Sequence, residues 1–165
     1  NLRIAHIISG TTVLDVLFDT NIVQDTWTEL VLTCDASGTN RVFSCYQNGL
    51  AASKTDTILR ASSSSMLPAS RTLTLGTWLN AAFFAFKIDN IASWSSVLTA
   101  AEAQEIYRSH PLLTSDHGDY SSSSNLTTYY TMEEGSGTTT SDVTGNSADD
   151  ITLTNGPTWS SDTMF

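Results

Sequence analysis

Short runs in which apolar and polar residues alternate, each closed by turn-forming residues, dominate the first hundred residues. Residues 2–8, 13–18, 29–34 and 41–47 show this alternation. A period of two places successive side chains on opposite faces of a strand. The segment 35–40, DASGTN, predicts a hairpin turn between the last two runs. Such spacing predicts an all-β, antiparallel sandwich or barrel. Further strands are expected at 71–75, 82–86 and 88–94.

One segment departs from this pattern and predicts a helix. Thr99-Ala-Ala-Glu102 has the spacing of a capping box, in which the Thr hydroxyl accepts a backbone N–H and the Glu carboxylate reaches back to the Thr N–H. Helix-forming residues follow as far as Tyr107, and Pro111 prevents a longer helix. We therefore expect one short helix at about residues 99–108.

The last third of the chain divides into a polar segment and a second group of strands. Residues 114–125, TSDHGDYSSSSN, have no apolar periodicity and are interpreted as a Ser-rich linker. Strands are expected after it at 126–132 and 151–153. The predicted organisation is the main part of a sandwich with its closing helix at 1–113, the linker at 114–125, and a β tail at 126–165. The tail completes a sandwich, either in its own chain or in a neighbouring protomer.

The balance of charge limits the partners of this chain. Of its 165 residues, 7 are Lys or Arg and 17 are Asp or Glu, which gives a net charge of −10. Neither a phosphate backbone nor an anionic membrane surface attracts such a chain. The sequence also has no run of 18 apolar residues. We expect no nucleic acid partner and no membrane insertion, while the spare carboxylates suit a cation such as calcium.

Two cysteines, Cys34 and Cys45, flank the predicted hairpin turn. An extracellular context favours a disulfide between them. The alternative is a pair of buried thiols. Their spacing is unlike that of a zinc site.

Two stretches carry a resemblance to a known family. Residues 27–35 and 42–49, WTELVLTCD and VFSCYQNG, resemble the central hairpin of the laminin-G-like and pentraxin-like jelly rolls of the concanavalin A-like group. Residues 86–94 and 98–107 resemble its last strand and closing helix. The resemblance implies an antiparallel jelly-roll β-sandwich with one short helix.

A third stretch resembles the same family but occupies an unexpected place. Residues 129–139, 141–146 and 153–159 resemble the family's N-terminal signature, yet they follow the closing helix. Three accounts are open: a circular permutation, a segment of a tandem array, or a tail that completes a neighbouring protomer. The chain begins at Asn1 inside an expected strand and without an initiating Met, which favours a repeating unit of a polymer.

Acidic residues in the tail form the first candidate site. Asp142, Asn146, Asp149 and Asp150 lie within one loop, and oxygen donors at this density suit calcium. The resemblance implies a calcium ion near such a loop, with Asp89 approaching it. The alternative is a solvated acidic loop built from Asx-turns.

Tryptophans form the second candidate site. Trp78 and Trp159 lie near turns and are candidate platforms for the rings of a carbohydrate ligand. Trp27 and Trp94 lie in strand patterns, so we expect them to pack in the core.

Glycosylation is a third possibility for this chain. Asn125-Leu126-Thr127 is an N-glycosylation sequon on the predicted linker. The serines at 121–124 are the candidate O-glycosylation sites. Both depend on a secreted protein.

Catalysis is not expected. Glycanases of related folds place two carboxylates across a glycosidic bond, whereas the adjacent Glu133 and Glu134 point to opposite faces of a strand. No nucleophile motif surrounds any Ser. We expect no enzyme activity.

The order of the segments gives the functional prediction. A sandwich that lacks its first strands exposes an edge, and a neighbour's tail can pair with it. Such contacts run head to tail between copies of the chain and generate filaments. We expect an extracellular or cell-surface structural protomer of a fibre or repeat array. The alternative is a lectin-like adhesion module that binds glycans with the help of calcium.

Overall fold

The structure is a computed structural model that describes residues 2–8, 11–58, 77–78, 82–83, 86–154 and 156–162. Its contacts divide the chain into two compact units. The first unit joins Asn1–Met66 to Trp94–Asn125, and the second joins Leu67–Ser93 to Leu126–Phe165. The chain therefore passes between the units three times.

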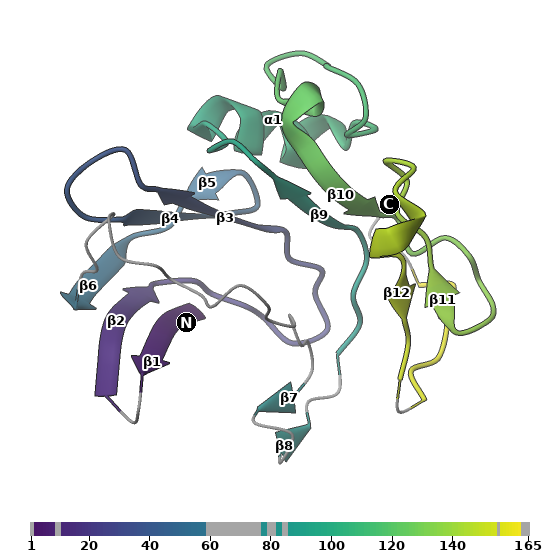
Figure 1. Cartoon of the computed structure of the whole chain (residues 1–165), viewed down its shortest axis with the longest axis horizontal. Coiled ribbons are helices and arrows are strands. Elements are labelled where there is room, and N and C mark those ends of the chain that lie inside the picture. The colour runs from purple at the N-terminus through teal and green to yellow at the C-terminus, as the bar shows by residue number, and fades with distance from the viewer. Residues whose placement is uncertain are drawn as a thin grey trace. The chain divides into compact units, whose positions relative to one another are not determined.

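Two antiparallel sheets form the first unit (Figure 1). One has the order β1-β2-β6, with β1 at Leu2–Ile8, β2 at Thr11–Phe18 and β6 at Lys54–Ile58. The other has the order β3-β4-β5, with β3 at Leu30–Asp35, β4 at Val42–Gln47 and β5 at Leu50–Ala51. These strands confirm the runs predicted at 2–8, 13–18, 29–34 and 41–47.

The core of the first unit lies between its two sheets. Val16 and Phe18 of β2 pack with Phe43 and Cys45 of β4, and all four are buried. The alternation of β4 explains this arrangement, because Phe43 and Cys45 share one face while their neighbours face away. The sandwich character of this unit rests on that cluster.

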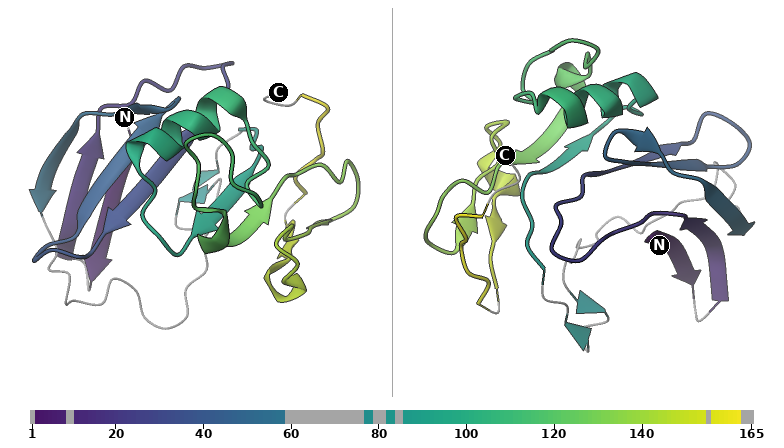
Figure 2. Two further views of the ribbon diagram at one scale, coloured as in Figure 1. Left: turned by 90° about the horizontal axis from the view of Figure 1, so that it is seen from above. Right: turned by 180° about the vertical axis from the view of Figure 1, so that it is seen from behind.

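The helix α1 spans Ala100–Ser109 and confirms the predicted capping box. Thr99 accepts the backbone N–H of Glu102, and the Glu102 carboxylate accepts the N–H of Thr99. The helix lies beside the β4–β5 turn in both views of Figure 2. Gly49 makes this approach possible, because a Cβ there would lie 3.0 Å from the Cα of Gln104. His110 ends the helix in the left-handed conformation, with φ of 45°.

The segment 114–125, which was predicted to be a linker, is instead a loop packed on the first unit. Tyr120 at its centre is completely buried, and its hydroxyl donates to the carbonyl of Leu113 at 2.9 Å. The indole N–H of Trp94 donates to the same hydroxyl at 3.0 Å. Ser122 is also buried. A polar composition predicts a flexible segment, but Tyr120 and Ser122 form hydrogen bonds with Leu113 and Glu102.

The second unit contains the tail and the strands that precede the helix. The strand β10 at Leu126–Tyr130 pairs with β9 at Ile91–Trp94. Next come the pairs β11–β12, at Thr139–Thr140 and Ile151–Thr152, and β7–β8, at Thr77–Trp78 and Ala82–Phe83. A short 3-10 helix lies in this unit at Ser147–Asp149 (η2), and another, at Ser123–Asn125 (η1), belongs to the first unit. The strand predicted at 71–75 lies outside the described residues.

None of the helices in the described ranges has the length and apolar character needed to cross a lipid bilayer.

Candidate functional site

The carboxylate of Glu102 joins the helix to the packed loop. One oxygen, Oε2, accepts the backbone N–H of Thr99 at 2.8 Å and its hydroxyl at 3.0 Å. The other oxygen, Oε1, accepts the hydroxyl of Ser122 at 2.5 Å and the N–H of Ser121 at 3.3 Å. Glu102 is only 4% exposed. One side chain therefore caps the helix and holds the loop that leads to the tail.

Hydrogen bonds decide the protonation state of Glu102. Burial is the largest single influence and acts to raise the pKa of this carboxyl. The hydroxyl of Ser122 and the two donors of Thr99 act in the opposite direction, and together they leave the pKa below its ordinary value. The carboxylate is therefore charged at neutral pH, and both of its oxygens accept hydrogen bonds.

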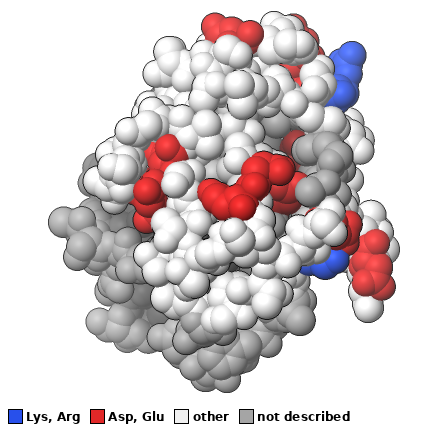
Figure 3. Space-filling view, turned by 90° about the vertical axis from the view of Figure 1, so that its right-hand side faces the viewer, with Lys and Arg blue, Asp and Glu red and all other residues white. Residues whose placement is uncertain are grey.

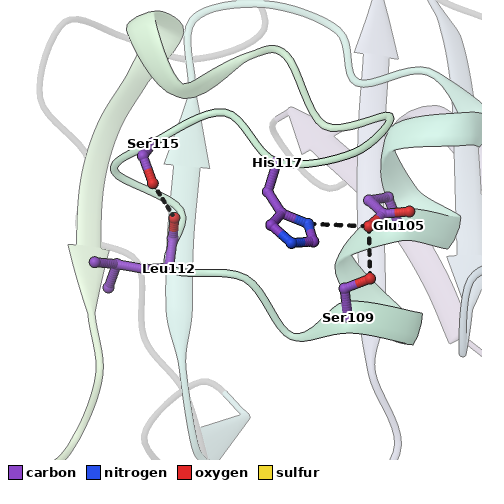
Figure 4. Close-up of polar contacts among 5 residues, drawn as sticks. All are labelled: Glu105, Ser109, Leu112, Ser115 and His117. Carbon is purple, nitrogen blue, oxygen red and sulfur yellow. Dashed lines mark hydrogen bonds and ion pairs between the residues drawn. The ribbon is translucent and has the colours of Figure 1, made fainter.

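A second carboxylate on the same helix, Glu105, holds the other end of the loop (Figure 4). Its Oε1 accepts the hydroxyl of Ser109 at 2.5 Å and lies 3.1 Å from Nδ1 of His117. The hydroxyl of Ser109 is the main cause that lowers the pKa of Glu105. Gly118 passes so close that a Cβ there would lie 2.5 Å from Oε1 of Glu105. Ser115 closes a turn nearby by donating to the carbonyl of Leu112.

This cluster of Ser, Glu and His does not have the geometry of an activated nucleophile. The hydroxyl of Ser109 donates to the Glu105 carboxylate, whereas a nucleophilic serine donates to an imidazole that a carboxylate orients. His117 contacts the same carboxylate oxygen. The cluster therefore ties the loop to the helix.

The β9–β10 ladder carries a set of hydroxyl contacts. Oγ of Ser93 lies 2.6 Å from Oγ1 of Thr127 and 2.7 Å from Oγ1 of Thr128. Thr127 also donates to the carbonyl of Ser93 at 3.0 Å. Tyr129 donates to the side chain of Asn90 at 3.0 Å. Side chains of β10 therefore form hydrogen bonds with Ser93 of β9 and with Asn90, which directly precedes β9.

The predicted calcium residues are engaged in hydrogen bonds of their own. Both oxygens of Asp142 accept donors: Oδ1 accepts the N–H of Tyr129 and of Thr144, and Oδ2 accepts the hydroxyl of Thr144. Burial acts to raise the pKa of Asp142, but these bonds outweigh it and lower the pKa. Asp142 is only 5% exposed. It organises the loop after β10.

The remaining acidic residues do not converge with Asp142 on one point. Asp150 accepts the N–H of Asp142 at 2.8 Å, and Asp149 accepts the amide of Asn146. Asp89 accepts the amide of its neighbour Asn90. No group of three or more His, Cys, Asp or Glu in the described part of the chain is arranged to hold a metal. The hydrogen bonds of Asp142 to Thr144 are those of an Asx-turn, and calcium binding by this loop stays a prediction. Carboxylates are nevertheless conspicuous on the face in Figure 3, where Lys and Arg lie only at the margins.

The tryptophans occupy different settings. Trp159 is partly exposed, and its indole N–H donates to the carbonyl of Gly137 at 2.8 Å. Trp27 and Trp94 are partly buried rather than fully buried. The backbone of Trp78 lies in β7, and its side chain lies outside the described part of the structure.

The two cysteines are free thiols, Cys34 exposed and Cys45 buried. The β3–β4 register explains why they are not joined. Cys34 lies opposite Phe43, and Cys45 lies opposite Leu32, so the cysteines are diagonal neighbours. Diagonal Cα atoms are about 7–8 Å apart, which is longer than the usual span of a disulfide.

Sequence reasoning missed one unusual carboxyl, that of Glu29. Its backbone pairs with Asn48, whose side chain accepts the N–H of Glu29 at 2.9 Å. Its Oε1 is buried and has no hydrogen-bond partner. Burial alone raises the pKa of Glu29 to about 7. No signal in the neighbouring sequence predicts this setting, because Asn48 is nineteen residues away in the chain.

Comparison with known proteins agrees with the sandwich of the first unit. A laminin-G-like family model, described as the concanavalin A-like lectin/glucanases superfamily, matches residues 1–104. No curated protein and no solved structure matches the chain. The matched range holds the two sheets of the first unit, β9 and half of α1. The chain therefore belongs to the concanavalin A-like lectin/glucanase superfamily, whose fold is a jelly-roll sandwich, as the sequence predicted.

Proposed function

We propose that this chain is an extracellular, non-catalytic structural protomer whose copies assemble head to tail by exchanging their C-terminal strands. The observation that carries the proposal is the pairing of β10 with β9. The tail meets the strand that precedes the closing helix, and a neighbour's tail would find the same partner there. Exchange of an identical element between protomers preserves every contact of the closed form.

The first unit keeps its core when the tail leaves. The buried cluster of Val16, Phe18, Phe43 and Cys45 contains no residue of 126–165. The anchor between Glu102 and Ser122 also belongs entirely to the first unit. An isolated two-stranded ladder is only marginally stable. Opening of β9–β10 therefore costs little compared with unfolding of the first unit.

The packed loop fixes the point from which the tail departs. Glu102 and Glu105 hold the loop, and the N–H of Ser95 donates to the carbonyl of Asn125 at 2.8 Å. Because β10 begins at Leu126, directly after the held Asn125, the tail has little free chain, which disfavours free diffusion and favours a defined partner. Exchange therefore involves residues from Leu126 onward rather than a long flexible arm.

Sedimentation velocity and negative-stain electron microscopy test this proposal. The intact chain is expected to form species that grow with concentration, and filaments at high concentration. Thr128→Pro places a ring in the middle of β10 and should reduce assembly, because proline removes an N–H and disfavours interior strand positions. A monomer at all concentrations, for the intact chain, would contradict the proposal.

A second candidate is a lectin-like module, favoured by Trp159. Its partly exposed ring is held in one orientation by the bond to Gly137, as a platform for sugar stacking requires. A glycan array with the intact chain and with Trp159→Ala tests this candidate. Binding that disappears in the variant supports it, and loss on chelation would show dependence on calcium.

A further inference from the structure

Asn125 lies where the packed loop passes into the tail. It ends η1 and precedes β10, and it is partly exposed. Its backbone is fully used: the N–H donates to the carbonyl of Ser122 at 3.0 Å, and the carbonyl accepts the N–H of Ser95. Its side-chain amide, in contrast, makes no hydrogen bond within the described structure. The fold therefore needs the backbone of Asn125 and leaves its side chain available.

The residues around Asn125 form an acceptor sequence for N-linked carbohydrate. Thr127 supplies the hydroxyl two positions later, and Leu126 between them is not proline. No other Asn-X-Ser or Asn-X-Thr triplet occurs in the 165-residue sequence. Asn125 is therefore the one residue in the sequence to which this motif assigns N-glycosylation.

The neighbouring serines are poorer candidates for modification. The hydroxyl of Ser122 is buried and donates to Glu102, and the hydroxyl of Ser123 donates to Asp116 at 2.6 Å. A sugar on either oxygen would replace a bond that holds the loop. The structure therefore favours Asn125 over Ser122 and Ser123 among the neighbouring candidates.

We propose that Asn125 carries an N-linked glycan, an inference that rests on the extracellular location in the proposed function. The donor is an oligosaccharide attached to a polyprenyl diphosphate. The amide nitrogen of Asn125 forms a bond to C1 of the first sugar and loses a proton. The C1–O bond breaks, and the polyprenyl diphosphate leaves with the electron pair. The product projects from the start of β10 without disturbing the Ser95–Asn125 bond.

Expression of the full chain behind a cleavable secretion signal in animal cells tests the site. Both the secreted and the cell-associated chain are analysed by gel mobility and peptide mass spectrometry, before and after digestion with peptide-N-glycosidase. We expect a single glycan, removed by the enzyme with conversion of Asn125 to Asp. The glycan should be lost in Asn125→Gln and Thr127→Val, and retained in Thr127→Ser.

Asn146→Gln is the matched control, because Asn146 is exposed but lies outside any sequon. It should keep the glycan. An unmodified Asn125 in both fractions, or a glycan that persists in Asn125→Gln, would overturn the inference. Assembly is measured separately by sedimentation. If the chain assembles without a glycan on Asn125, the glycan proposal fails and the strand exchange stands. If the chain carries the glycan but stays monomeric, the strand exchange fails and the glycan proposal stands.

Discussion

The carboxylate of Glu102 accepts the hydroxyl of Ser122 at 2.5 Å, although twenty residues separate them in the chain. The same carboxylate caps its own helix through Thr99. This pair converts a polar stretch into a fixed loop. The position from which the C-terminal strands leave the sandwich depends on it.

Glu102→Gln should lower the free energy of unfolding by about 1–3 kcal/mol, because buried donors lose a charged acceptor. Ser122→Ala should cost about 1 kcal/mol, and the double variant should cost less than the sum of the two, since both remove the same bond. Denaturant unfolding gives all three values. Ser124→Ala is the matched control: Ser124 is exposed, and it should change stability by less than about 0.5 kcal/mol. Strict additivity would contradict the pairing.

The lowered pKa of Glu102 also sets the direction of an acid effect. Because the folded pKa lies below the ordinary value of 4.5, the stabilisation is complete above that value and is lost as pH falls through the folded pKa. Unfolding curves from pH 6 to pH 2 should show this loss in the parent chain. Glu102→Gln should flatten it.

Gly118→Ala should destabilise the chain more than Gly135→Ala. Both glycines have positive φ, 54° and 65°, so each alanine carries a conformational cost of about 1 kcal/mol. Only at Gly118 would the new Cβ meet Glu105. We expect an additional loss of about 1 kcal/mol there, because the Glu105 carboxylate has to move and weaken its hydrogen bond to Ser109 or His117. Equal losses in the two variants would show that the loop is not packed on Glu105.

The buried Glu29 should make the chain less stable as pH rises from about 4.5 to about 7. In this interval the folded state binds a proton that the unfolded state has released. The effect amounts to about 1–2 kcal/mol after allowance for partial exposure. Glu29→Gln should therefore gain stability relative to the parent chain between pH 4 and pH 8. Glu133→Gln, at an exposed position, should show no such trend.

Cys34 should react with Ellman's reagent in the folded chain, whereas Cys45 should react only after unfolding. The first thiol is exposed, and the second is buried in the core, where burial also raises its pKa. The assay should count one thiol per native chain and two per unfolded chain. No reactive thiol after unfolding without reductant would indicate a disulfide.

The sequence predicted the elements whose signals are local. The strands at 30–35 and 42–47 follow from alternation around a turn, and the helix follows from the spacing of Thr99 and Glu102. Each of these signals spans only a few residues. The family assignment agrees with them.

The parts that sequence analysis missed depend on distant partners. The serines at 121–123 have the composition of a linker, and only the structure shows that they form hydrogen bonds with Glu102 and Asp116. Calcium at the acidic loop stays a prediction, but the sequence does not reveal that Oδ1 of Asp142 accepts the backbone N–H groups of Tyr129 and Thr144. Likewise, nothing near Glu29 in the sequence shows that its Oε1 is buried without a partner.

The most direct test of strand exchange is a cysteine trap across the β9–β10 ladder. Ser93→Cys and Thr127→Cys are placed on separate chains in a Cys34→Ser, Cys45→Ala background, and the two chains are refolded together and oxidised. Their native hydroxyls are 2.6 Å apart, so the new thiols face each other wherever the ladder forms. Ser124→Cys replaces Thr127→Cys in the control.

Exchange predicts a disulfide-linked dimer from the Ser93→Cys and Thr127→Cys chains and little from the control mixture. A double variant that carries both changes should then give a series of disulfide-linked oligomers of increasing size. The account is contradicted if the separate chains do not cross-link while the double variant closes a bond within each monomer.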